Sequence, residues 1–106
     1  MTADQEDTMA KLLYGSPPTV FEVDDRTLAH VEVVVMAKLR RNESFAYSIE
    51  QSDQARTTIW IGVHSDLQFV YDRPRSEINR DWLGLLVDSA NSTQGLRVMP
   101  EDESAA

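Results

Sequence analysis

The fold of this chain is limited above all by three short stretches in which apolar and polar residues alternate. They lie at residues 45–50, 57–63 and 67–71, and each places its apolar side chains on one side of an extended backbone. Only a few polar residues separate the stretches, which favours antiparallel neighbours joined by short turns over parallel strands joined by helices. The middle of the chain is therefore predicted to be a three-stranded antiparallel meander.

A helix is predicted immediately before the meander. Four apolar residues recur there at intervals of three or four: Leu28, Val31, Val35 and Leu39. Asp24 and Asp25 are typical of a helix start, where a carboxylate accepts from free backbone N–H groups, and basic residues follow at 38–41, where the helix dipole favours cations. The β-branched run at 31–35 is typical of a strand, so part of this segment could instead be extended. A stretch of about 15 residues is nevertheless too long for an ordinary strand, and we predict the helix.

A second helix is predicted after the meander. Its apolar residues at helical spacing are Ile78, Trp82, Leu85, Leu86 and Ala90. Ser76 is the expected N-cap, and Gly95 is expected to take the left-handed conformation that follows a helix end. Strands are expected at 11–14 and 19–23, as an opening hairpin, and at 96–99 near the end of the chain.

These elements follow one another in the order ββ-α-βββ-α-β. The sequence therefore predicts an α+β fold: a single small domain at residues 9–100, with a mostly antiparallel sheet and two helices packed on one face of it. The segments outside it, 1–8 and 101–106, hold six acidic side chains and no basic one, and we expect them to be disordered, solvated tails. These tails account for −6 of the formal charge of −8, which leaves the domain at −2.

Composition excludes several classes of protein. The chain has 106 residues and no cysteine, which excludes a disulfide framework, thiolate metal sites and cysteine nucleophiles. No apolar run approaches the roughly 20 residues of a membrane span, and the N-terminus lacks the pattern of a secretion signal. We expect a cytoplasmic protein that does not associate with membranes.

Few residues could support catalysis or hold a cofactor. The four glycines lie far apart, so a glycine-rich loop that could hold phosphate is absent, and the serines lack the glycine-flanked turn of common hydrolases. His30 and His64 lie on different predicted elements, and we expect both to be polar surface or boundary residues rather than metal ligands. Asp24 and Asp25 are better explained as a helix cap than as a catalytic carboxylate pair. We predict no catalytic residue, no cofactor and no metal site.

The basic residues are the one set that suggests a ligand. Eight of the ten are arginines, whose planar guanidinium suits phosphate or carboxylate recognition, and Trp60 lies opposite Ile59, where it could stack on a base. The possible nucleic-acid or anion contacts are Lys38, Arg40, Arg41, Arg56, Arg73, Arg75, Arg80 and Trp60. Against this interpretation, a domain charge of −2 lacks the basic surface expected of a nucleic-acid-binding domain.

Several segments resemble a family of short actinobacterial proteins that contain a domain of unknown function. The segments are KLLYGS at 11–16, FEVDDRTLAHVEVVVMAKLRRNESF at 21–45, TTIW at 57–60 and INRDWLGLLVDSANSTQGLRVMPE at 78–101. Members of this family are often labelled ATP-dependent DNA ligases, and the resemblance implies that label for this chain. The residues do not support it, because a ligase of this kind needs a lysine in a Lys-x-Asp-Gly setting, and neither Lys11 nor Lys38 is followed by that pattern.

The sequence favours a non-enzymatic α+β binding module that acts through contacts with a protein partner or with a second copy of itself. Exposed sheet edges in a domain of this size often pair with another chain. The alternative is a nucleic-acid-binding accessory domain that uses the basic residues named above. A small hydrolase or transferase is a third interpretation, for which the sequence shows no constellation of catalytic residues.

Overall fold

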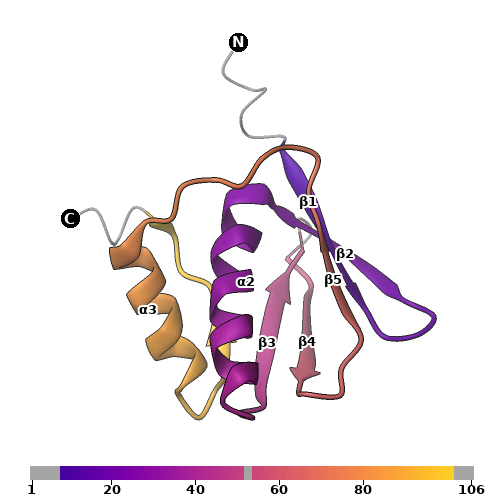
Figure 1. The fold of residues 1–106 in the computed structure, drawn as a ribbon, viewed down its shortest axis with the longest axis vertical. Helices are drawn as coiled ribbons and strands as arrows, with labels where there is room; N and C mark the ends of the chain where they lie inside the picture. Colours follow the sequence, from indigo (N-terminus) through magenta and orange to yellow (C-terminus); the bar gives the residue numbers. More distant parts are fainter. Residues whose placement is uncertain (1–7, 52–53, 102–106) are drawn as a thin grey trace.

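The computed structural model describes residues 8–51 and 54–101 (Figure 1). Its elements are β1 (Met9–Tyr14), β2 (Thr19–Asp24), α2 (Asp25–Arg40), β3 (Phe45–Glu50), β4 (Arg56–Ile61), β5 (Leu67–Val70), α3 (Arg80–Ala90) and β6 (Leu96–Arg97). The predicted order ββ-α-βββ-α-β and the α+β class are confirmed. Most of the predicted tails, at 1–7 and 102–106, lies outside the described residues.

The strands form two sheets rather than the one predicted. The first has the order β2-β1-β5 and is antiparallel, and the second has the order β4-β3-β6, with β6 parallel to β3. The predicted meander is therefore wrong at its third strand, because β5 pairs with β1 and not with β4. The turn at 62–66 carries the chain from the second sheet to the first. Just before β5 begins, the Asp66 carbonyl accepts from the Gly15 N–H (2.9 Å).

Helix α2 begins as the sequence predicts. The Asp24 carboxylate accepts from the Thr27 N–H (3.0 Å) and so caps the first turn. The β-branched run lies within the helix, where Val31, Val34 and Val35 are almost completely buried. Burying a valine contributes about 1.5–3 kcal/mol, whereas its weak helix propensity costs less than about 1 kcal/mol. Packing against the rest of the protein therefore decides the conformation of this segment.

Helix α3 begins three residues later than predicted. Asn79, and not Ser76, is the N-cap, since its side-chain oxygen accepts from the Trp82 N–H (3.1 Å). The Ser76 hydroxyl instead donates to the buried carboxylate of Asp25 (3.2 Å). Serine and asparagine are about equally good caps, so the nearby hydrogen-bond partners determine which of the two is used.

The two helices run side by side in the same direction, with α2 between α3 and β3 in the view of Figure 1. Near their N-termini, the His30 ring lies 4.6 Å from the Trp82 ring, measured between centroids. Near their C-termini, the Lys38 ammonium donates to the Asn91 side chain (2.7 Å). The sequence predicts both helices on one face of a single sheet, whereas in the structure α2 contacts β1 and β2 of the first sheet and α3 contacts β3 and β6 of the second.

His30 is completely buried, so the prediction that it is a surface or boundary residue is wrong. Its Nε2 accepts from the Asn79 N–H (2.9 Å), and its Nδ1 lies 2.8 Å from the Arg26 carbonyl. A backbone N–H can only donate and a carbonyl can only accept, so the two partners fix a neutral ring with its proton on Nδ1. The ring is held on both sides, which is why it can be buried without a charge.

Glu101, predicted to open the C-terminal tail, is bound to the folded domain. Its carboxylate accepts two hydrogen bonds from the Arg26 guanidinium (2.8 and 2.7 Å) and one from the Asn79 side chain (2.9 Å). The Trp82 indole N–H also donates to the Met99 carbonyl (2.9 Å). We refer to Arg26, His30, Asn79, Trp82 and Glu101 as the helix lock, because they join the beginnings of both helices to the end of the described chain.

One core joins all the layers. Its largest buried side chains include Leu12 from β1, Leu28 from α2, Tyr47 from β3, Ile61 from β4, Leu86 from α3 and Leu96 from β6. Because both sheets and both helices contribute, neither sheet has a separate core, and the described residues form a single domain. Within residues 8–51 and 54–101, neither helix has the length and apolar character needed to cross a membrane.

Candidate binding groove

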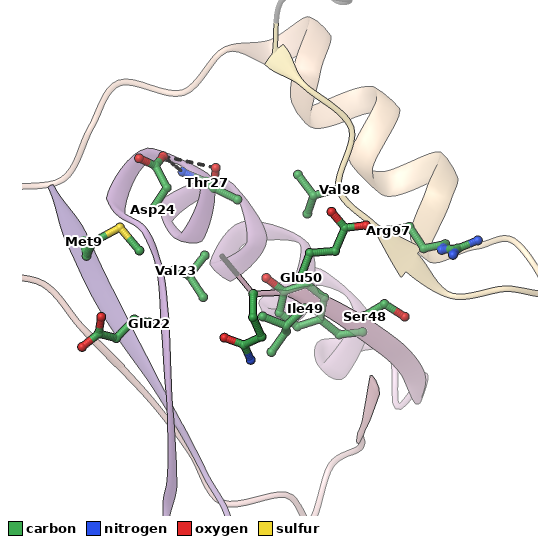
Figure 2. Close-up of a pocket in the computed structure, with 12 residues that line it drawn as sticks. Met9, Glu22, Val23, Asp24, Thr27, Ser48, Ile49, Glu50, Arg97 and Val98 are labelled. Carbon is green, nitrogen blue, oxygen red and sulfur yellow. Dashed lines mark hydrogen bonds between the residues drawn. The ribbon is translucent and has the colours of Figure 1, made fainter. Parts of the chain in front are cut away.

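A groove of about 510 Å³ separates β2 in the first sheet from the end of β3 in the second (Figure 2). Its walls include Glu22–Asp24 of β2, Ile49–Gln51 at the end of β3, and Arg97–Val98 where β6 ends. The volume lies within the range of about 300–1,000 Å³ that is usual for ligand sites.

The first wall of the groove is an open strand edge. β2 pairs only with β1 among the described strands. Just after β2, the Asp25 N–H donates back to the Thr8 carbonyl (3.1 Å), on the β1 side. Because backbone groups alternate in direction along a strand, the N–H and C=O of Glu22 point away from β1 and toward the groove. In the groove, β2 therefore presents the N–H donor and the C=O acceptor of Glu22 with no strand beside them.

The second wall is also an open strand edge. β6 covers β3 only at Tyr47 and Ser48. The Gln51 N–H donates to the Ala55 carbonyl (2.7 Å), on the β4 side, so the backbone groups of Glu50 point to the opposite side, beyond the end of β6. The open edges of β2 and β3 consequently border the same groove.

The groove exists because β6 is shorter than the sequence predicts. The predicted strand at 96–99 ends at Arg97, whose N–H is bound by the Ser89 hydroxyl of α3 (2.9 Å). Farther along, the Met99 carbonyl is held by the Trp82 indole. These two contacts draw the chain toward α3 and leave the end of β3 uncovered.

The inside of the groove is apolar and its rim is acidic. Val23 and Ile49 are buried, and Val98 is partly buried. Figure 2 shows Val23 pointing into the groove and Glu22 on the other side of β2. Glu50 extends from β3 toward Val98 in the same view. A ligand in this groove would meet apolar side chains on the core side and carboxylates on the solvent side.

The side chains with reactive groups in this groove have roles in the fold. The Ser48 hydroxyl is paired with the Thr58 hydroxyl (2.9 Å), and the Asp24 carboxylate caps α2. Burial raises the pKa of the Tyr47 hydroxyl far above its ordinary value of 10, so this phenol keeps its proton at neutral pH. The groups free to bind a ligand include the backbone groups of Glu22 and Glu50, an arrangement typical of proteins that bind an added strand.

The structure places the predicted basic contacts in three separate regions. Lys38 is buried: besides its bond to Asn91, it lies 3.3 Å from the Glu43 carboxylate and 5.7 Å from the centre of the Phe45 ring. Arg40 and Arg41 are exposed beside it, at the C-terminal end of α2. Lys38 therefore contributes to the fold, and only the two arginines of this group are accessible.

The other predicted contacts lie away from that end of α2. Arg73, Arg75 and Arg80 precede or begin α3, near the N-terminal half of α2, and Arg75 approaches the Glu32 carboxylate (4.0 Å). A 16-residue helix is about 24 Å long, so these arginines and the Arg40–Arg41 pair lie toward opposite ends of it. Arg56 and Trp60 share the outer face of β4, where Trp60 is 61% exposed. The eight residues do not form one surface.

Sequence reasoning did not identify the residues that line the groove. The side chains that line the groove are of ordinary types and do not indicate a site; they include Glu22, Val23, Glu50 and Val98. The site is defined instead by backbone groups that lack a partner. The nearest indication was the general expectation of exposed sheet edges. The location of such an edge depends on the order of strands in the sheets, which a single sequence does not contain.

Comparison with known proteins identifies a family and no activity. A family model described as a domain of unknown function, DUF7882, matches residues 9–101. The search of curated proteins and the search of solved structures found no match. The family match agrees with the resemblance seen in the sequence, but it does not bear on the actinobacterial source or on the ligase label.

Proposed function

We propose that this chain, which belongs to the DUF7882 family of domains of unknown function, is a non-enzymatic protein-binding module. In this proposal, the groove between β2 and β3 takes up an extended segment of a partner protein. The observation that carries it is that the backbone groups of Glu22 and Glu50, on two different sheets, open onto one groove. A strand placed there would form hydrogen bonds on both sides and connect the two sheets in the order β4-β3-segment-β2-β1-β5.

The free energy available sets an expected affinity. Glu22 and Glu50 each offer one backbone donor and one acceptor, and each bond formed contributes a net of about 0.5–1.5 kcal/mol. Ordering each residue of the incoming segment costs about 1–2 kcal/mol, so the backbone bonds alone give weak binding. Burial of apolar side chains against Val23 and Ile49 must supply the rest. We expect dissociation constants of about 1–100 μM for a short peptide.

Two features support a protein rather than a nucleic acid as the partner. The basic residues are divided among three regions, and the most buried of them, Lys38, already has partners within the chain. The groove itself is bordered by carboxylates, which repel phosphate. A phosphate-binding surface needs cations that converge, since most of its affinity comes from neutralised phosphates.

The proposal can be tested with a library of displayed peptides selected on the immobilised protein. The decisive variant is Glu22→Pro, which removes the outward N–H of β2 and, at an edge position, leaves the pairing with β1 intact. Val20→Pro is the matched control, because its N–H also points away from β1 but lies outside the groove. Circular dichroism checks that both variants fold.

We expect enriched peptides that bind the unmodified chain, bind Val20→Pro equally well, and lose at least about tenfold in affinity for Glu22→Pro. A tenfold loss is about 1.4 kcal/mol, at the upper end of the net contribution of the one backbone hydrogen bond that proline removes. A library that yields no binding peptide, or peptides that bind Glu22→Pro as tightly as the unmodified chain, would show that the groove does not act by strand addition.

A further inference from the structure

We infer that the partner segment is basic, with cationic side chains at alternate positions and apolar side chains between them. This inference rests on the proposed function, because it describes the occupant of the same groove. It assigns the class of partner: an extended, positively charged stretch of another protein.

The charge of the groove is the first argument. Three carboxylates line it, at Glu22, Asp24 and Glu50, against one guanidinium, at Arg97. The Arg97 guanidinium donates to the Gln94 side chain (2.9 Å), and Figure 2 shows it pointing away from Val23. A ligand in the groove therefore faces a net negative rim.

The direction of the side chains is the second argument. Along β2, Val23 is buried while Glu22 and Asp24 are exposed, and along β3, Ile49 is buried while Glu50 is exposed. A strand between them must alternate in the same way, so every second side chain meets Val23 and Ile49 and the others emerge beside Glu22 and Glu50. Neighbours on one face of paired strands lie about 4.5–5.5 Å apart at Cβ, which allows a lysine or arginine to reach a carboxylate.

The same argument disfavours a second copy of this chain as the occupant. Besides the two-residue β6, a second copy could offer three edge strands: β4, with the single basic residue Arg56, β5, with no charged residue, and β2, with Glu22 and Asp24. None of the three alternates cationic with apolar side chains, and insertion of β2 would place carboxylates beside Glu22 and Glu50 of the first copy. Like charges directly opposite each other in a sheet are destabilising, and the formal charge of −8 opposes self-association further.

The test uses three acetylated and amidated peptides of about six residues, a typical strand length, that alternate valine with lysine, serine or glutamate. Binding to the full chain is measured by isothermal titration calorimetry at low salt. We expect the lysine–valine peptide to bind about tenfold more tightly than the serine–valine peptide, and the glutamate–valine peptide not to bind. The preference for lysine should shrink as salt is raised.

Variants separate this inference from the proposed function. Replacing both Glu22 and Glu50 by glutamine keeps the backbone of the groove and removes its charge, so we expect the lysine–valine and serine–valine peptides to become equal in affinity for this double variant. Equal affinities for the unmodified chain, with binding still lost in Glu22→Pro, would overturn the inference and leave strand addition standing. If none of the three peptides binds, and the display library also yields none, both proposals fail.

Discussion

Two regions near the start of α2 differ in how completely their hydrogen-bonding groups find partners within the chain. In the helix lock, the hydrogen-bonding groups of His30, Arg26 and Glu101 find partners within the domain. In the groove, a few residues away, the backbone groups of Glu22 and Glu50 have no strand beside them. The first region has what a stable fold needs, and the second has what is needed to bind another chain.

The two regions also differ in the kind of chemical group from which each is built. Conspicuous side chains such as His30, Lys38 and Trp82 are all buried in structural contacts. The candidate site is made instead of backbone that lacks a partner, next to side chains of ordinary type. The comparison predicts that changes in the lock reduce stability and that changes in the groove reduce binding.

The largest effect is expected from Trp82→Ala. Trp82 is 3% exposed, packs on His30 and holds the Met99 carbonyl, so its removal should lower the free energy of unfolding by about 3–5 kcal/mol. The control is Trp60→Ala, at a side chain that is 61% exposed, for which we expect a change within about 0.5 kcal/mol. Urea unfolding followed by circular dichroism measures both. Losses of similar size would mean that the lock is not a centre of stability.

Gly95→Ala tests the close approach of β6 to β3, the strand whose far end borders the groove. Gly95 has a φ of +82°, and a Cβ at this position would lie 2.6 Å from the Ala46 carbonyl oxygen, so β6 can approach β3 only with glycine there. We expect a loss of about 3 kcal/mol from strain and overlap. Gly84→Ala is the control: it has open space and lies inside α3, so it should gain about 0.5–1 kcal/mol. Calorimetric melting compares the two, and a stable Gly95→Ala variant would contradict the close approach.

The smallest effect concerns pH and the Arg26–Glu101 pair. Hydrogen bonds from the Arg26 guanidinium, and then from the Asn79 side chain, lower the pKa of Glu101 from 4.5 to about 2. Because the pKa is lower in the folded state, the carboxylate stabilises the fold above about pH 4.5, and this contribution disappears as the pH falls toward 2. The side chains are partly exposed, so we expect only about 1 kcal/mol at neutral pH.

Glu101→Gln isolates this contribution. The difference in the free energy of unfolding between this variant and the unmodified chain should be largest at pH 6–7 and should vanish near pH 2. Guanidinium chloride would screen the ion pair, so urea is the denaturant to use. A difference that stays constant between pH 7 and pH 2 would show that the Glu101 charge does not contribute.

The sequence predicts those parts of the fold that depend on local pattern. The order of elements, the Asp24 cap and the left-handed Gly95 follow from periodicity and turn chemistry, and the structure confirms them. The features that the sequence does not predict depend on partners far away in the chain. Asn79 caps α3 in place of Ser76, and His30 is buried, because Asn79 and His30 bind each other across 49 positions.

The candidate site is one of the features that depend on distant parts of the chain and that the sequence does not predict. Nothing near Glu22 or Glu50 in the sequence indicates that β5 pairs with β1, that β6 stops at Arg97, or that two sheets form in place of one. The basic residues were more conspicuous, but Arg40 and Arg80 lie toward opposite ends of the paired helices and so do not share one surface. Open edges become visible only when the strand order is known.

The most direct test of strand addition is amide hydrogen exchange of the isotope-labelled chain, measured by NMR with and without a saturating peptide from the display selection. We predict that the amides of Glu22 and Glu50 exchange at least about tenfold more slowly in the complex, since each then donates to a neighbouring strand, while the Val20 amide is unchanged. Slower exchange confined to other regions, with Glu22 and Glu50 unaffected, would contradict the account and move the binding surface elsewhere.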